Sequence, residues 1–148
     1  MPRAKSAPST VISLRLPAAS TERLKRMALR HGWTTSDTSA RLVEEGLRRS
    51  EFALIDYRDS PVGRQTYIQG STLAVWEVVQ LIRDYSGDLA AVAAHLEWPE
   101  TRVRAALNYA DAFPEEIDTA IAEDESITLD DLKRLLPNID RFSARLED

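Results

Sequence analysis

The chain has 148 residues, a formal net charge of −5, no cysteine and two histidines, His31 and His95. This length allows one or two small domains and excludes a large multidomain enzyme. Without cysteine there is no disulfide framework and no cysteine-bearing zinc site, and two histidines argue against a histidine-built metal centre. We therefore expect a protein of the reducing cytoplasm without cofactors or a metal. No apolar run approaches the roughly 20 residues of a membrane helix, and no secretion signal is expected.

The charge is unevenly distributed along the chain. Residues 1–50 hold ten Lys and Arg residues and four acidic residues, a net charge of +6, whereas residues 51–148 hold nine and twenty, a net charge of −11. A basic N-terminal part on an acidic body indicates a polyanionic partner at one end only. The alternative is an ordinary solvated surface on which like charges cluster by chance. Residues 1–8 are expected to be a disordered basic arm.

Residues 9–50 predict the order strand, helix, helix. Pro17 closes a short strand whose apolar side chains alternate with mostly polar ones. A first helix is expected to be capped by Ser20 and to end at Gly32, and Thr34 is expected to cap a second helix. The two faces of the strand are Ile12, Leu14 and Leu16 on the apolar side, and Val11, Ser13 and Arg15 on the other.

A strand and two short helices cannot bury enough apolar surface to fold alone, and the strand would expose both of its edges. We therefore expect a homodimer in which two strands pair antiparallel over four packed helices. Such a ribbon is narrow enough to enter the DNA major groove, where Arg15 would contact guanine, Ser13 a base edge and Val11 a thymine methyl. The alternative is that Arg15 is a solvated residue on a dimerisation module.

The strings VISLRLP, ERLKRMALRHG and TTSDTSARLVEEGLRR resemble the ribbon-helix-helix repressors of the Arc and MetJ type over residues 10–49. The resemblance implies that backbone N–H groups at Thr34 and Thr35 bind a phosphate. One departure is Thr38, where an aliphatic residue is usual. The resemblance also implies that the outward strand residues read bases of operator DNA, here Val11, Ser13 and Arg15.

Residues 53–124 predict a second domain that is mainly helical. Two extended runs, 55–58 and 65–68, flank a turn-rich stretch and predict a β-hairpin. A helix with apolar side chains at helical spacing follows it, and a fourth helix is expected to begin at Pro114. Three large aromatic residues are either partner anchors or core: Trp76, Trp98 and Tyr109.

The second and third helices of this domain have the spacing of a helix-turn-helix motif. Asp88 is expected to cap the second helix, and Pro99 suits the first position of the third. The outward Arg102 and Arg104 of the third helix would give a second DNA contact. The alternative is a packing or partner-binding role, because acidic residues surround the motif and repel DNA: Glu97, Glu100, Asp111, Glu115 and Glu116.

Residues 59–85 and 88–118 resemble a family of small winged-helix-like domains of unknown function that is found in bacterial antitoxins. The match is carried by the series from Arg64 to Trp76, by Tyr109 and by the Pro-Glu-Glu-Ile-Asp run that begins at Pro114. Members fused to a DNA-binding segment are similar to VapB-type antitoxins. The resemblance implies a PIN-domain-like ribonuclease toxin as the partner.

The C-terminal residues 125–148 predict a short helix capped by Thr128 and broken by Pro137, followed by a charged tail with apolar anchors. Such a tail is typical of a segment that orders on a partner. The antitoxin resemblance implies that it wraps the toxin and that Arg141 or Arg145 reaches an acidic metal site there. The alternative is a tail that folds back onto its own domain. The candidate toxin-binding residues are Ile139, Arg141, Phe142, Arg145 and Leu146.

The sequence thus predicts a mainly α protein: an N-terminal ribbon-helix-helix dimer, a helix-turn-helix-like domain with a β-hairpin, and a C-terminal tail. We expect a type II antitoxin that binds operator DNA as a dimer or a higher oligomer, represses its own transcription and neutralises a PIN-like ribonuclease. The alternative is a stand-alone ribbon-helix-helix regulator without a toxin. An enzyme is not expected, because no nucleophile with a base and no phosphate-binding glycine loop is present.

Overall fold

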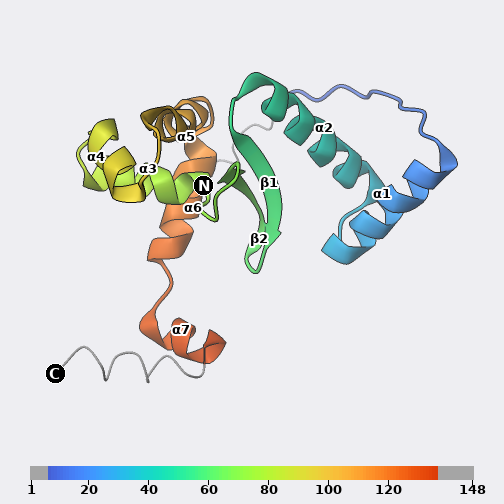
Figure 1. Cartoon of the computed structure of the whole chain (residues 1–148). Coiled ribbons are helices and arrows are strands. Elements are labelled where there is room, and N and C mark those ends of the chain that lie inside the picture. Colours follow the sequence, from blue (N-terminus) through green and yellow to red (C-terminus); the bar gives the residue numbers. More distant parts are fainter. Residues whose placement is uncertain (1–6, 137–148) are drawn as a thin grey trace. The chain divides into compact units, whose positions relative to one another are not determined.

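The computed structural model describes residues 7–136, and most of the expected N-terminal arm lies outside the described residues (Figure 1). Within them the chain is mainly α, as predicted, with one antiparallel β-hairpin. None of the described helices is long and apolar enough to cross a membrane. The elements are α1 Ala18–His31, α2 Thr35–Glu51, β1 Ile55–Ser60, β2 Gly63–Ile68, α3 Val75–Asp84, α4 Leu89–Leu96, α5 Glu100–Ala112, α6 Pro114–Glu125 and α7 Leu129–Leu135.

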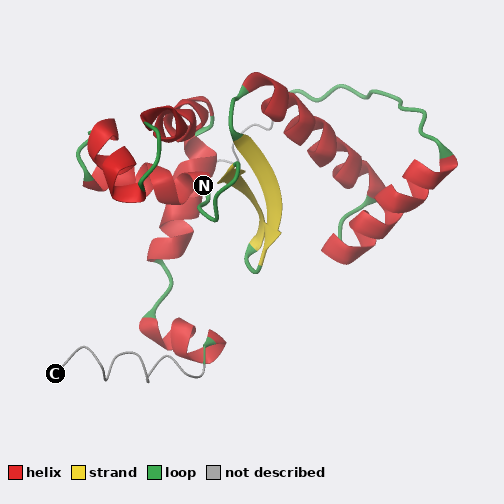
Figure 2. Ribbon diagram, viewed as in Figure 1, coloured by secondary structure: helices red, strands yellow, loops and turns green. Residues whose placement is uncertain are grey.

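The predicted strand at residues 9–16 is absent, and this part of the fold prediction is corrected. Residues 7–17 have no regular secondary structure, and the strands of the described residues form a hairpin that follows α1 and α2 (Figure 2). A strand is held by hydrogen bonds to a neighbouring strand. The described part of a single chain offers residues 9–16 no such neighbour, so the segment stays unpaired.

Two compact units make up the chain, and the division falls between Glu44 and Glu45, inside α2. The sequence instead places the end of the first domain at residue 50. The difference has a physical reason: the side chains of the last two turns of α2 form ion pairs and a cation–π contact within the second unit. Helical periodicity shows which side of a helix is apolar, but it does not show which domain the helix packs against.

Helix α1 begins at Ala18, two residues before the expected cap. Pro17 precedes it, and the carbonyl of Pro17 accepts the N–H of Thr21 at 3.0 Å. The helix ends at Gly32 as predicted, where a φ of 67° is needed and Trp33 donates its N–H to the Ala28 carbonyl at 2.9 Å. Glycine takes this left-handed conformation without the steric cost of a Cβ atom.

The β-hairpin is confirmed, with strands longer than the predicted runs. The pairing runs from Ile55 opposite Ile68 to Ser60 opposite Gly63, across a two-residue turn. Side chains of a strand alternate between its faces, and here Ile55 and Tyr57 of β1 are buried together with Thr66 and Ile68 of β2. This face of the hairpin belongs to the core of the second unit.

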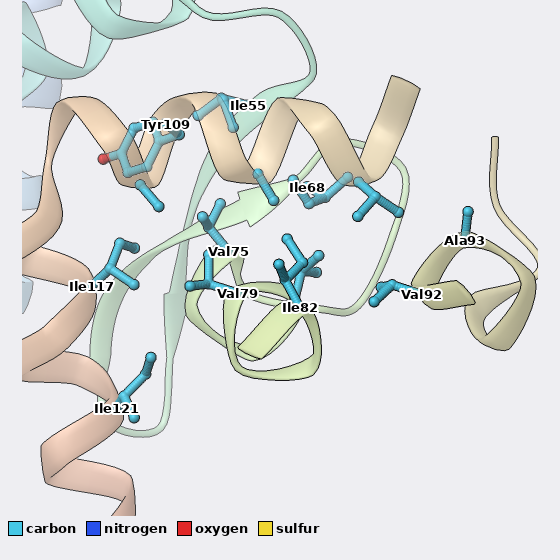
Figure 3. Close-up of a cluster of buried hydrophobic side chains, with 14 of the residues drawn as sticks. Ile55, Ile68, Val75, Val79, Ile82, Val92, Ala93, Tyr109, Ile117 and Ile121 are labelled. Atoms are coloured by element: carbon cyan, nitrogen blue, oxygen red, sulfur yellow. The ribbon is translucent and has the colours of Figure 1, made fainter. Parts of the chain in front are cut away.

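The core of the second unit is formed by the hairpin and helices α3 to α6 (Figure 3). Tyr109 is fully buried and belongs to it, while Trp76 and Trp98 are half-buried against it, which favours the core interpretation of these aromatic residues. Asp88 caps α4 by accepting the Ala91 N–H at 3.1 Å, as predicted. A short turn joins α4 to α5, and Pro99 lies just before α5 rather than at its first position.

Candidate nucleic-acid and dimer interface

The N-terminal unit has almost no core of its own. Among residues 7–44, the buried side chains are Ala28 and Thr38. A folded unit of this size normally hides most of its large apolar side chains. Here the exposed ones include Val11, Ile12, Leu14, Leu16, Leu29 and Val43.

The segment with the predicted base-reading residues lies open to solvent. Val11 is 94% exposed, and Ser13 and Arg15 are exposed as well. The apolar residues that alternate with them are also exposed, from 79% at Ile12 to 47% at Leu16. The described single chain therefore covers neither face of this segment.

Two open apolar grooves adjoin the segment. One, of about 640 Å³, is lined by Ile12, Leu14, Leu24 and Val43 among others. The second, of about 700 Å³, is lined by Leu16, Leu42 and apolar side chains of α1, with Arg23, Arg26 and Arg30 beside them. The exposed apolar surface thus continues from the extended segment across α1 and α2.

The N-terminus of α2 is capped as predicted. Thr34 Oγ1 accepts the N–H of Asp37 at 3.0 Å. The first N–H groups of a helix have no intrahelical acceptor, and the positive end of the helix dipole lies there. Thr34 and Thr35, predicted to bind a phosphate, are both exposed at this end. The carboxylate of Asp37 in the same turn would oppose an approaching phosphate.

Thr38, the departure from the resemblance noted above, is fully buried. Its Oγ1 donates a hydrogen bond to the Thr34 carbonyl at 2.8 Å. A buried hydroxyl is costly mainly when it has no partner. The threonine therefore fits this position without leaving a buried polar atom unpaired.

An aromatic stack at the loop between α1 and α2 was missed by the sequence analysis. The His31 ring stacks on Trp33 with centroids 4.3 Å apart, and the Arg41 guanidinium lies 4.3 Å from the Trp33 ring centroid. The stack places a cation of α2 on the loop that leads to the start of that helix. In the sequence, the tryptophan directly after Gly32 is a signal for such a stack. Its partner Arg41 could not be identified in this way, because it lies two turns into the next helix.

Arg102 and Arg104, the predicted second DNA contact, are both engaged within the second unit. Arg102 Nη2 donates to the Gln69 carbonyl at 3.2 Å, and its guanidinium lies over the Trp98 ring. Arg104 forms an ion pair with Glu100 at 2.9 Å, in which both side chains are exposed. A phosphate contact here would compete with these interactions.

The candidate toxin-binding residues Ile139, Arg141, Phe142, Arg145 and Leu146 lie outside the described residues. The helix that precedes them is described. Thr128 caps α7 through reciprocal hydrogen bonds with Asp131, as expected of its N-terminus. At its C-terminal end Leu135 is 72% exposed and Leu136 is 55% exposed. Two adjacent leucines in solvent indicate an apolar surface that a partner can cover.

Within residues 7–136, no group of three or more His, Asp or Glu side chains is arranged to hold a metal ion. The described residues present an apolar surface with three arginines beside it on the N-terminal unit. Neither a protein-family model nor a curated protein nor a solved structure matches the chain.

Proposed function

We propose that the protein is the antitoxin of a type II toxin-antitoxin pair. Two copies join through their N-terminal units, bind operator DNA and repress their own transcription. The C-terminal region neutralises a PIN-like ribonuclease. The observation that carries the dimer and its DNA contact is the near absence of a core in residues 7–44, next to the exposed segment that holds Arg15.

A second copy of the chain is the occupant that best suits the apolar face of the N-terminal unit. Full burial of an aliphatic side chain such as Ile12, Leu14 or Leu16 stabilises an assembly by about 1.5–3 kcal/mol. Antiparallel pairing of two identical segments about a two-fold axis places the same side chains of both copies on one side. It also supplies the hydrogen-bond partners that the unpaired segment lacks.

Two observations support DNA as the ligand: the positive charge of the N-terminal residues, and the side chains that the shared core of the dimer would leave exposed. Residues 1–50 carry a net charge of +6. In a paired ribbon, Val11, Ser13 and Arg15 would point away from the helices, where a major groove can receive them. Arginine suits this role because its guanidinium can donate two hydrogen bonds to guanine.

Replacement of Arg15 by alanine is expected to weaken specific operator binding by about 1–3 kcal/mol. The loss should be larger for the chain's own upstream DNA than for random DNA, because a base contact is removed. Gel-shift titration of both DNAs measures it. Lys25→Ala removes the same charge from an exposed position of α1 and should weaken binding to both DNAs alike. Undiminished discrimination in the Arg15 variant would exclude base reading by the ribbon.

Removal of residues 137–148 is expected to leave operator binding unchanged and to abolish toxin neutralisation. The exposed leucines at the end of α7 support a partner contact in this region. The test is growth of cells that co-express the full or truncated chain with the ribonuclease encoded beside it. Growth rescue by the truncated chain would contradict neutralisation by the tail. Absence of any such ribonuclease would favour the stand-alone regulator.

A further inference from the structure

The second half of α2 is attached firmly to the second unit. Arg48 donates from Nη1 to the Tyr109 hydroxyl at 2.6 Å and to Glu116 Oε2 at 3.0 Å. Its guanidinium also lies 3.7 Å from the centroid of the Phe113 ring. One side chain of α2 thereby contacts both α5 and α6.

A second attachment joins α2 to the hairpin. Glu45 is 8% exposed, and its carboxylate accepts two contacts from Arg64 Nε, at 2.6 and 3.0 Å. Burial alone would lower the pKa of Arg64, but the hydrogen bonds and negative charges of Glu45 and Asp59 together outweigh burial, so the net pKa is raised. A charge pair with little water around it is strongly directional.

Tyr109 fixes the geometry of this attachment. Its hydroxyl lies within hydrogen-bond distance of Arg48, Glu116, Tyr57 and Thr66. A hydroxyl has one proton and two acceptor lone pairs. Since the guanidinium can only donate and the ionised carboxylate only accept, Tyr109 donates to Glu116 and accepts from Arg48. One lone pair remains for Tyr57 or Thr66, so the network has a defined direction.

The first half of α2 buries few side chains within its own unit. Between residues 35 and 44, Thr38 is the buried residue, while Val43 is 48% exposed. Yet α2 is one continuous helix from Thr35 to Glu51. Starting a helix is unfavourable by a factor of about 10³, whereas extending one is nearly neutral. A held segment can therefore serve as the nucleus for the turns before it.

We propose that the second unit orders the DNA-binding unit by holding residues 45–51 of α2 as a helical nucleus. Glu45 and Arg48 are positioning residues: they order residues 35–44 before the two copies meet. This ordering strengthens self-association because less conformational entropy is lost at that step. The consequence for operator binding rests on the proposed function, whereas the consequence for helix order does not.

The test uses the full chain with Arg48→Met, which keeps an unbranched stem over Phe113 and removes the guanidinium. Amide hydrogen exchange at residues 38–44 is measured at concentrations where the chain is monomeric. Protection there is expected to fall about tenfold or more, and the dissociation constant of the dimer to rise by a similar factor, within the nucleation limit of about 10³. Glu45→Gln keeps the shape of the side chain and should give a smaller change in the same direction.

Arg49→Met is the matched control. Arg49 is the next residue of the same helix, but its pair with Asp56 at 3.1 Å is about half exposed, so protection and dimerisation should change less than twofold. The proposal is overturned if Arg48→Met and Glu45→Gln lower the melting temperature of the second unit while residues 38–44 keep wild-type protection. If the wild-type chain fails to bind its upstream DNA, the proposed function is contradicted. The hydrogen-exchange comparison still tests the ordering of residues 38–44, because it does not depend on DNA.

Discussion

A Leu14→Glu variant is expected to be monomeric and to lose operator binding. Leu14 is 59% exposed in the single chain, so the change should leave the second unit intact. In the paired ribbon the same position enters the shared core, where an unpaired carboxylate costs several kcal/mol. Sedimentation equilibrium measures the dimer, circular dichroism checks the remaining helices, and a gel shift measures DNA binding.

Ser13→Glu is the matched control for this variant. It introduces the same side chain one residue earlier, on the opposite face of the segment. This variant should still form a dimer but should bind operator DNA poorly, because a carboxylate then faces the phosphates. Wild-type self-association of the Leu14 variant, or loss of the dimer in the Ser13 variant, would contradict the assignment of the two faces.

The second large effect is expected from Tyr109→Phe, which removes one oxygen from the centre of the second unit. The hydroxyl donates to Glu116 and accepts from Arg48, and Tyr57 and Thr66 also lie within reach. Its loss deprives the buried hydroxyls of Tyr57 and Thr66 of this partner, at a cost of about 1–3 kcal/mol in the free energy of unfolding. Urea denaturation followed by tryptophan fluorescence measures this cost.

Tyr85→Phe provides the comparison for that measurement. The Tyr85 hydroxyl lies 3.0 Å from His95 Nδ1 in a residue that is 37% exposed, so water can replace the lost bond. Its removal should change the free energy of unfolding by less than about 0.5 kcal/mol. Equal effects of the two variants would show that the Tyr109 network contributes nothing beyond an ordinary surface hydrogen bond.

The stability of the second unit should also fall in alkali. Burial raises the pKa of Tyr109 and of Tyr57 above the ordinary value near 10. The folded chain therefore holds these protons at a pH where the unfolded chain releases them, so unfolding becomes easier as the pH rises above about 10. Below that pH the stabilisation is complete. In Tyr109→Phe the fall in free energy of unfolding between pH 9 and 11 should be shallower.

The site residues differ in how far they could be predicted. The alternation at residues 11–16 predicts a strand with two faces, but the described segment has no regular secondary structure and the side chains of both sets are exposed. Arg102 and Arg104 were predicted from outward helix positions. The contact of Arg102 with Gln69 emerges only from the fold, whereas Arg104 and Glu100 have the i, i+4 spacing of neighbours on one helix. The Trp33 stack was missed because it joins the loop to a residue on α2.

The sequence alone was sufficient to predict the features that depend on residues close together in the chain. Gly32 ends α1, Asp88 and Thr128 cap their helices, and Pro114 opens α6, because each acts through its own φ angle or through a hydrogen bond three residues away. The hairpin was predictable for the same reason, since its two strands are joined by a short turn.

Only the tertiary structure decided to which unit the end of α2 belongs. Glu45 meets Arg64 across 19 positions of the chain, and Arg48 meets Glu116 across 68. Periodicity identifies the buried side of a helix but carries no information on which distant side chain will lie against it. The sequence alone therefore determined the elements and their caps, while packing between distant residues determined the boundary between the two units.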